Sequence, residues 1–262
     1  MVNYEMRGIV LAAVIGACSN GSSVTSATPQ PPPAVPQVLL HTTLDNPGAI
    51  SAPAVGTGTG AVIATAPSND FVVARIGSGL RTDAIGERVQ FPQTSGGVQN
   101  VELLRGTLEF WYRPNYNHDD NLKYAIAGTG DWQGSPPARG SIHLGKHNSS
   151  NQNKIFLIFY DANQVRWEHN VAVSDYSWRA GDWLQIRLTW DFGVAAGVQN
   201  LHLYVNGQEL RLTGEVSRGP QPVPAESTSE LVYIGSRDTA GTIIANGLYD
   251  DVKIWNAAIP PN

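Results

Sequence analysis

Cysteine, charged residues and helical periodicity are scarce in this chain. Cys18 is the one cysteine among 262 residues, so no disulfide can form within the chain. Only 15% of the residues are charged, whereas 27 glycines and 17 prolines supply many turn residues. No stretch after Thr28 has a convincing helical period. Because little charge and frequent turns favour short strands over helices, the sequence predicts an all-β protein.

Basic stripes and metal-ligand spacings are also missing. The formal net charge is −5, and no basic stripe is visible, which argues against nucleic-acid binding. His143 and His147 lie close together, but Gly145 between them breaks any helix that would align them. None of the histidine spacings marks a metal site. We therefore interpret the six histidines as surface or loop residues.

The start of the chain has the layout of a secretory signal peptide. Residues 6–18 read MRGIVLAAVIGAC, in which one arginine precedes an apolar run too short to span a membrane. The last four of these residues resemble a bacterial lipobox, whose cysteine becomes the lipidated first residue of the mature protein. We predict a signal peptide over 1–18, lipidation at Cys18 and export as a cell-envelope lipoprotein. The alternative is a plain export signal that leaves Cys18 as a free thiol or removes it.

Residues 19–37 follow as a segment rich in serine and threonine and then in proline. Such a composition cannot bury a core and predicts an extended tether. The folded domain is expected over residues 38–262. Anchor, tether and domain together are typical of a surface-displayed module that touches the membrane only through its lipid.

The run 183–190 predicts a central strand, because its even-numbered residues are all apolar. A second alternating run, 201–205, ends in Asn206-Gly207. This pair is the strongest short hairpin signal, since a type I′ turn needs positive φ at both central residues. Residues 208–212 then return as the partner strand. The centre of the protein is therefore expected to be an antiparallel meander with one apolar face.

Other short strands are separated by turn signals along the whole domain. This pattern predicts a two-sheet sandwich or jelly roll. The expected strands are 38–44, 61–64, 71–76, 89–91, 106–113, 124–127, 141–144, 155–160, 165–169, 231–235 and 247–255.

Five motifs occur in a fixed order: GTLEFWYRPNYN, WRAGDWLQIRLTWD, LHLYVNGQEL, LVYIGS and NGLYDDVKIWNAAI. This ordered set resembles the concanavalin A-like lectin/glucanase superfamily, specifically the laminin G-like modules of bacterial surface proteins. The resemblance covers about residues 38–258 and implies a two-sheet antiparallel jelly-roll sandwich. Members include lectins, carbohydrate-binding modules, adhesion domains and glycoside hydrolases, so the fold leaves the function open.

The acid pair of the hydrolase branch is missing. That branch carries an E-x-D-x-x-E strand, which directs two carboxylates to one face. Glu109 has no acidic partner two residues on, Asp119 and Asp120 are adjacent, and Glu168 stands alone. We therefore predict a protein that is not an enzyme. A divergent glycosidase remains the third hypothesis.

The resemblance implies a structural Ca²⁺ between the first and last strands. Calcium takes carboxylate and carbonyl oxygens. The candidates are Asp250, then Asp45, then Asp251. Alternation places Asp250 on the core face of the last strand, where a carboxylate needs a cation, backbone N–H groups or an arginine. The acidic loop 115–121 is a second possible Ca²⁺ site, but we interpret it as a solvated turn.

Sugar binding needs an exposed aromatic ring beside polar side chains. Alternation assigns Phe110 and Trp190 to the core, whereas Tyr116, Trp132 and Trp167 lie in loops or polar strands. These three are our candidate ligand-binding residues, and burial is the alternative for each. The leading hypothesis is a non-catalytic glycan-binding or adhesion module. The second is a structural component that contacts other surface proteins.

Overall fold

The computed structural model describes residues 35–63, 70–132, 137–238 and 240–261. The predicted signal peptide, the lipidation site Cys18 and most of the predicted tether lie outside the described residues. A compact unit covers Ala34–Asn262. Within the described ranges, no helix is long and apolar enough to cross a membrane.

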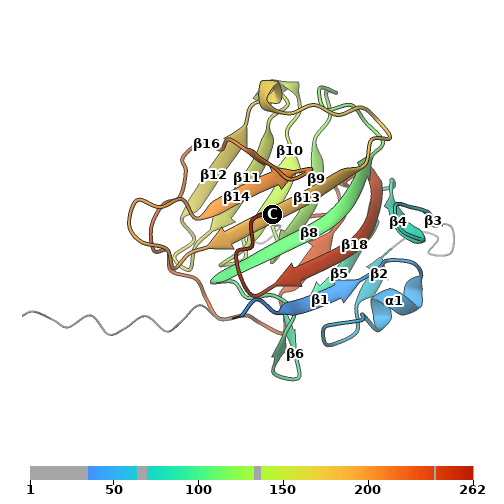
Figure 1. Cartoon of the computed structure of the whole chain (residues 1–262), viewed down its shortest axis with the longest axis horizontal. Helices are drawn as coiled ribbons and strands as arrows, with labels where there is room; N and C mark the ends of the chain where they lie inside the picture. The colour runs from blue at the N-terminus through green and yellow to red at the C-terminus, as the bar shows by residue number, and fades with distance from the viewer. Residues whose placement is uncertain (1–34, 64–69, 133–136, 239, 262) are drawn as a thin grey trace, which may run out of the picture. The chain divides into compact units, whose positions relative to one another are not determined.

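Two eight-stranded antiparallel sheets form this unit (Figure 1). We call them sheet A and sheet B. Sheet A has the order β15-β14-β13-β8-β18-β4-β3, with β1 also paired to β18. Its strands are β1 (Val38–Thr42), β3 (Phe71–Val73), β4 (Ser78–Thr82), β8 (Arg105–Pro114), β13 (Leu184–Asp191), β14 (Leu201–Val205), β15 (Gln208–Leu210) and β18 (Gly247–Trp255).

Sheet B has the order β16-β12-β11-β10-β9-β17-β5-β2. Its strands are β2 (Ala61–Ile63), β5 (Arg88–Pro92), β9 (Tyr124–Thr129), β10 (Ile142–Lys146), β11 (Ile155–Tyr160), β12 (Arg166–Val171), β16 (Thr213–Gly214) and β17 (Leu231–Ile234). A separate small hairpin joins β6 (Thr94–Ser95) to β7 (Val98–Gln99). The predicted all-β sandwich of two antiparallel sheets is confirmed.

The core lies between the sheets and follows the predicted alternation. Phe110 and Trp190 are 0% and 1% exposed, and both belong to the main apolar cluster. From sheet B, Leu157 and Phe159 enter the same cluster. The hairpin after β14 is also confirmed, because Asn206 and Gly207 both have positive φ, 51° and 80°.

The last strand departs from the predicted alternation. Asp251 has φ 51°, and the register of β18 against β8 shifts between Asp250 and Lys253. This bulge puts Tyr249 and Val252 in the core cluster, whereas Asp250 lies opposite Trp111 on the outer face of sheet A. The expectation that Asp250 shares the core face is therefore wrong.

Short helical turns were not expected from the periodicity. The helix α1 (Pro47–Ser51) has proline in its first turn, and the Asn46 side chain accepts the Ala49 N–H at 3.0 Å. Both residues are typical of a helix start. Two 3₁₀ turns, Ser149–Asn151 and Val173–Asp175, complete the helical segments of the described residues.

Candidate functional site

The face of sheet B that points away from the core carries an unusual set of side chains. On β11, Leu157 and Phe159 point inward, so Phe156, Ile158 and Tyr160 point outward. The register sets residues of β10 and β12 beside them on the same face. These outward residues are His143, Gly145, Arg166, Glu168 and Asn170. We call this surface the outer face of sheet B.

Two glycines let large rings lie flat on this face. A Cβ on Gly128 would come within 2.7 Å of His143 Nδ1. A Cβ on Gly145 would come within 2.4 Å of Phe156 Cζ. The imidazole and the phenyl ring therefore occupy the space that side chains at these glycines would fill. As a result His143 is 0% and Phe156 1% exposed, although both face outward.

Trp132 lies over this floor from the connection between β9 and β10. Its ring meets His143 edge-on at 4.9 Å and Tyr160 edge-on at 5.6 Å. The Arg237 guanidinium lies 4.7 Å from the ring centroid. The main-chain N–H of Trp132 donates to the main-chain carbonyl of Arg237 at 3.2 Å. Trp132 is partly buried and packs on the cluster of Phe156, Ile158 and Tyr160. It is therefore the predicted aromatic that the structure places on the outer face of sheet B.

Several buried polar atoms of this face have no hydrogen-bond partner within the described residues. They are Ser141 Oγ, both ring nitrogens of His143, His147 Nδ1 and Asn170 Oδ1. A buried polar atom left without a partner costs about 1–3 kcal/mol. The His143 nitrogens lie under the Trp132 ring, whereas His147 and Asn170 lie farther along the face beside Phe156. Unpartnered buried polar atoms are expected where water or a polar ligand supplies the missing bonds.

The outer face of sheet B carries an ion pair on β12 and two neutral imidazoles, of His143 and His147, at β10. Burial opposes ionisation of Glu168, but Arg166 and a hydrogen bond from His147 hold its pKa below the usual value. His147 Nε2 lies 3.2 Å from Glu168 Oε1. Burial lowers the pKa of His147, and burial together with Arg237 lowers the pKa of His143 to about 3. Both imidazoles are thus neutral at pH 7, and each offers one donor and one acceptor.

The interpretation of the histidines as surface or loop residues is wrong for three of them. His143 and His169 are 0% exposed, and His147 is 7% exposed. The residues Ile142 and Leu144 on either side of His143 point into the core, which a strand prediction already implied. His143 is covered on its outer face by contacts with Gly128 and Trp132. These residues come from another strand and a loop, so the sequence pattern around His143 does not predict its burial.

The other two predicted aromatics are not on this face. Tyr116 is 5% exposed and stacks on Tyr124 at 3.6 Å, so the expectation of an exposed ring is wrong. Trp167 lies opposite Phe159 and packs against the main core, so it points inward and is only partly exposed. Trp178, at the start of one of the five motifs, is 4% exposed, and its Nε1 donates to the Tyr116 carbonyl at 3.2 Å.

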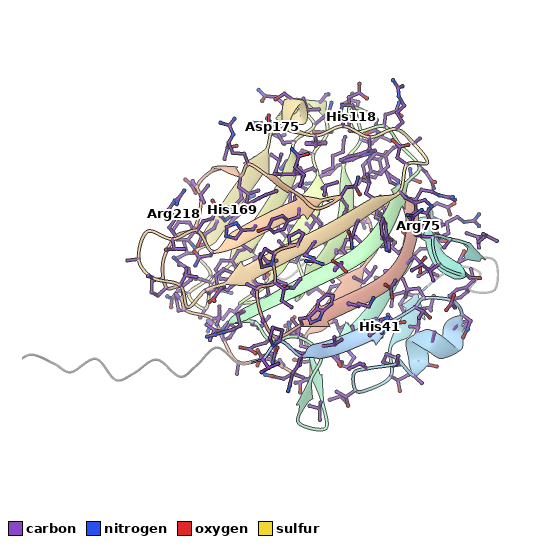
Figure 2. All side chains as sticks on the ribbon, in the orientation of Figure 1. His41, Arg75, His118, His169, Asp175 and Arg218 are labelled. Carbon is purple, nitrogen blue, oxygen red and sulfur yellow. The ribbon has the colours of Figure 1, made fainter. Side chains whose placement is uncertain are left out.

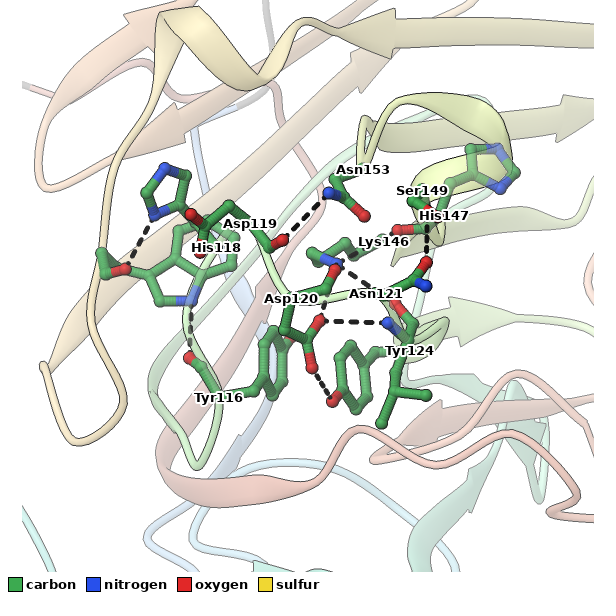
Figure 3. Close-up of polar contacts among 12 residues, drawn as sticks. Tyr116, His118, Asp119, Asp120, Asn121, Tyr124, Lys146, His147, Ser149 and Asn153 are labelled. Atoms are coloured by element: carbon green, nitrogen blue, oxygen red, sulfur yellow. Dashed lines mark hydrogen bonds and ion pairs between the residues drawn. The ribbon is translucent and has the colours of Figure 1, made fainter.

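A buried lysine organises the acidic loop 115–121 (Figure 3). The Lys146 side chain is 0% exposed. Its ammonium lies 2.7 Å from Asp120 O, 2.9 Å from Asp120 Oδ1, 3.1 Å from Leu122 O and 3.2 Å from His147 O. The Tyr124 hydroxyl also donates to Asp120 Oδ2 at 2.5 Å. The ammonium thus fills the oxygen cage that Ca²⁺ would need here, and the turn is tied to the fold rather than simply solvated.

The predicted calcium ligands lie at one corner of sheet A. Asp250 is 0% exposed; its Oδ2 accepts the Ile76 N–H at 2.6 Å, and its Oδ1 has no partner within the described residues. Burial raises the pKa of Asp250 to about 6, and the charges of Asp251 and Asp45 add to the rise. Asp45 Oδ1 accepts the Ser78 N–H at 2.8 Å. A cation would relieve both the crowding of charge and the bare oxygen of Asp250.

Asp251 fits such a site less well. Its Oδ1 lies 2.7 Å from His41 Nε2, and its Oδ2 lies 2.5 Å from Lys253 Nζ. Within the described ranges, no three His, Cys, Asp or Glu side chains converge as a metal cluster. Asp250 and Asp45 could therefore hold a calcium ion only together with main-chain or water oxygens, which calcium accepts readily.

The hollows of the surface lie elsewhere. One of about 520 Å³ is lined by Gln199, Glu209, Leu210, Arg211, Leu212 and Arg218, which include no aromatic ring. Figure 2 labels Arg218, one of these residues, at the left edge of the view. A smaller hollow of about 130 Å³ contains Trp178, but that side chain is almost fully buried and holds the acidic loop. Neither hollow combines an accessible aromatic ring with unpartnered polar atoms.

Solved structures with the same fold include carbohydrate-related proteins. Domain 4 of the arabinanase AbnA from Geobacillus stearothermophilus, in complex with arabinotriose, matches with TM-score 0.54 and 14% identity, over 86% of this chain and 94% of that one. The binding domain of botulinum neurotoxin DC, in complex with SialylT, matches with TM-score 0.54 and 11% identity, over 85% and 48%. A Trypanosoma rangeli sialidase matches with TM-score 0.50 and 15% identity, over 85% and 31%. At these identities the likeness shows the fold alone.

Comparison with curated protein sequences gave no match. A family profile, described as the concanavalin A-like lectin/glucanases superfamily, matches residues 84–262. This range holds β8, β13, β14, β17 and β18, the strands that carry the five ordered motifs. The lectin-like jelly roll of two antiparallel sheets agrees with the profile. The chain therefore belongs to the concanavalin A-like lectin/glucanase superfamily.

Proposed function

We propose that this protein is a non-catalytic carbohydrate-binding module whose site is the outer face of sheet B around Trp132. One observation carries the proposal: a partly exposed tryptophan stands beside buried polar atoms that no group of the described residues satisfies. A sugar offers both kinds of partner, since its C–H face packs on an aromatic ring and its hydroxyls donate and accept hydrogen bonds.

The surrounding side chains match such a ligand. Tyr160 contacts Trp132 and lies opposite Arg166, so it joins the aromatic part of the face to the charged edge. Arg166 and Glu168 form an ion pair that presents both donors and acceptors. The neutral ring of His143 lies directly under Trp132. Because both nitrogens of His143 are buried, a sugar hydroxyl would reach them only when the Trp132 ring moves aside.

The proposal of a non-catalytic role rests on the carboxylates of this face. Hydrolysis of a glycosidic bond uses two carboxyl groups on opposite sides of the bond. The outward positions of β10, β11 and β12 hold one, Glu168, and that carboxylate is held by Arg166 and His147. Asp131 and Glu230 lie beside Trp132 outside these strands, and the Glu230 carboxylate accepts the Asp131 N–H at 3.2 Å. The lone carboxylate on the strands supports binding over the divergent-glycosidase hypothesis.

The test is retention on immobilised polysaccharides, with arabinan and sialylated glycans in the panel because structural neighbours were solved with arabinotriose and with SialylT. Trp132→Ala should abolish retention on the glycan that the wild type binds. The matched control is Trp255→Ala, which removes a partly exposed tryptophan from sheet A. If both variants lost retention equally, or if the folded wild type were not retained, the result would favour the second hypothesis, a structural component that contacts other surface proteins.

We propose further that Ca²⁺ stabilises the corner formed by Asp45 and Asp250. The bare Oδ1 of Asp250 and its raised pKa support this. Calcium chloride should raise the Tm of the wild type relative to EDTA, and Asp250→Asn should lose that response. The control is Asp182→Asn, which changes an exposed carboxylate elsewhere. An equal Tm in Ca²⁺ and EDTA for the wild type would exclude a bound structural calcium.

We propose display at the bacterial surface through a lipid on Cys18, on the strength of the sequence layout of residues 1–37. Metabolic labelling with an alkyne fatty acid should mark the full-length protein and leave Cys18→Ser unlabelled. Equal labelling of the wild type and Cys18→Ser would contradict a lipid anchor at Cys18. Release of the unlabelled wild type into the medium would contradict it as well.

A further inference from the structure

Two arginines on the outer face of sheet A lie over tryptophan rings. The Arg75 guanidinium is 4.9 Å from the centroid of Trp111, and the Arg113 guanidinium is 5.4 Å from the centroid of Trp183. Arg75 is exposed, and the other three side chains are partly exposed. Figure 2 labels Arg75 beside the ribbons of β8 and β18. We call this set of four residues the Arg–Trp surface.

The strand geometry makes these two pairs neighbours. Trp111 and Arg113 both point away from the core on β8, since Tyr112 between them is in the core cluster. Residues two apart on a strand are separated by about 6.5–7 Å. Arg75 reaches Trp111 from the β3–β4 connection, and Trp183 directly precedes β13, which pairs with β8. The two guanidinium groups therefore belong to one continuous surface.

Neither guanidinium has a carboxylate partner within the described ranges, whereas other cations of this sheet face do. Arg187 pairs with Glu109, and Lys253 with Asp251. Asp250, opposite Trp111, is buried and its Oδ2 accepts the Ile76 N–H. Asp45 also lies near this turn, where its Oδ1 accepts the Ser78 N–H at 2.8 Å. In a chain of net charge −5, both guanidinium groups are thus free of an ion pair among the described residues, although carboxylates lie beneath the turn that carries Arg75.

The stacking leaves the hydrogen-bond donors of both arginines available. The N–H groups of a guanidinium lie in the plane of the group, and a cation–π contact does not use them as hydrogen-bond donors. That planar fork matches the two oxygens of a carboxylate. Beside Arg75, Val73 and Ile76 are 82% and 58% exposed, which adds apolar surface for C–H groups. The surface thus offers carboxylate forks and apolar contact side by side.

We propose that the Arg–Trp surface is a second binding site, which takes a polysaccharide carrying carboxylates on successive sugars. Two forks on one surface fit a polymer whose charge repeats, and the exposed valine and isoleucine fit the C–H faces of its rings. Because the protein as a whole is negatively charged, general attraction to an acidic polymer is weak, so the two arginines must supply the recognition. This site is independent of the one around Trp132.

The test is calorimetric titration with polygalacturonate, and with the same polymer after methyl esterification of its carboxylates. The wild type should bind the acid and not the ester, and added salt should weaken binding. Arg113→Gln and Arg75→Gln should each lower the affinity about tenfold, because each removes a charged hydrogen-bonding group. Arg113→Lys should lose most of the same affinity, since lysine keeps the charge without the planar fork.

Two controls separate this site from other causes. Arg211→Gln removes one positive charge from a side chain that is 79% exposed, and it should bind like the wild type. Trp132→Ala should also bind polygalacturonate normally, so that failure of the site on sheet B and failure of this one are distinguishable. The inference is overturned if the folded wild type does not bind the acid, if the ester binds equally well, or if Arg211→Gln loses as much affinity as Arg113→Gln.

Discussion

Replacement of Lys146 by methionine tests how the acidic loop is held. The ammonium has three N–H donors, and it lies within 3.2 Å of four oxygens of Asp120, Leu122 and His147. Methionine keeps the unbranched shape of the side chain, one atom shorter, but removes the charge and every donor. The carboxylate of Asp120 would then face a buried apolar group instead of its counter-ion.

The cost follows from the burial of the pair. Removal of one member of a buried ion pair costs about 3–5 kcal/mol. Because the Asp120 side chain keeps 24% exposure, water can solvate it in part, so we expect the lower end, about 3 kcal/mol. For a domain of this size, that loss lowers Tm by about 6–12 °C.

Urea unfolding followed by tryptophan fluorescence would measure the loss directly. The matched control is Lys154→Met, which changes a partly exposed lysine and should stay within about 0.5 kcal/mol of the wild type. Asp120→Asn should cost less in the Lys146→Met background than alone, as expected for a coupled pair. A loss below about 1 kcal/mol in Lys146→Met, or an equal loss in the control, would refute the reasoning.

Other predictions concern the outer face of sheet B. Folding lowers the pKa of His143 from 6.5 to about 3, so between these values the unfolded state binds the proton preferentially. The contribution of the neutral ring to the free energy of unfolding is therefore fully present above pH 6.5. It is lost as the pH falls toward 3, at up to about 1.4 kcal/mol per pH unit. His143→Gln should flatten this part of a urea-unfolding pH series, whereas an unchanged slope would contradict the burial of the neutral ring. Gly145→Ala should destabilise by about 1–3 kcal/mol because its Cβ would meet Phe156 and the Tyr124 carbonyl. Gly193→Ala, where the nearest atom is 3.3 Å away, is the control, and equal stability of the two variants would argue against the flat packing.

Much of the fold follows from local sequence pattern. Alternation alone assigned Phe110 and Trp190 to the core, and the Asn206-Gly207 pair fixed the hairpin between β14 and β15. These features depend on neighbours in sequence, which a single chain displays directly. The bulge at Asp251 does not, because it depends on how β18 pairs with β8 and β1, and the contacts of Asp251 with His41 and Lys253 form only in the folded chain.

The candidate site was only partly predictable for the same reason. Trp132 stood out because no alternating pattern buried it. The surface beneath it depends on the packing of His143 over Gly128 and of Phe156 over Gly145. Both contacts require the register between β9, β10 and β11, which the sequence does not display. The polar loop around Tyr116 favours an exposed ring. In the fold, however, the buried Lys146 ammonium binds the Asp120 carbonyl and lies over the Tyr116 ring, which holds this loop against β10.

The central claim is that a sugar binds on sheet B beside Trp132. The most direct measurement is a ¹⁵N NMR titration of the tryptophan indole N–H signals with oligosaccharides of the glycan retained in the panel. The account predicts that the Trp132 signal shifts on binding, while those of Trp111, Trp183 and Trp255 on sheet A stay in place. Shifts confined to the sheet A tryptophans, with Trp132 unchanged, would contradict it.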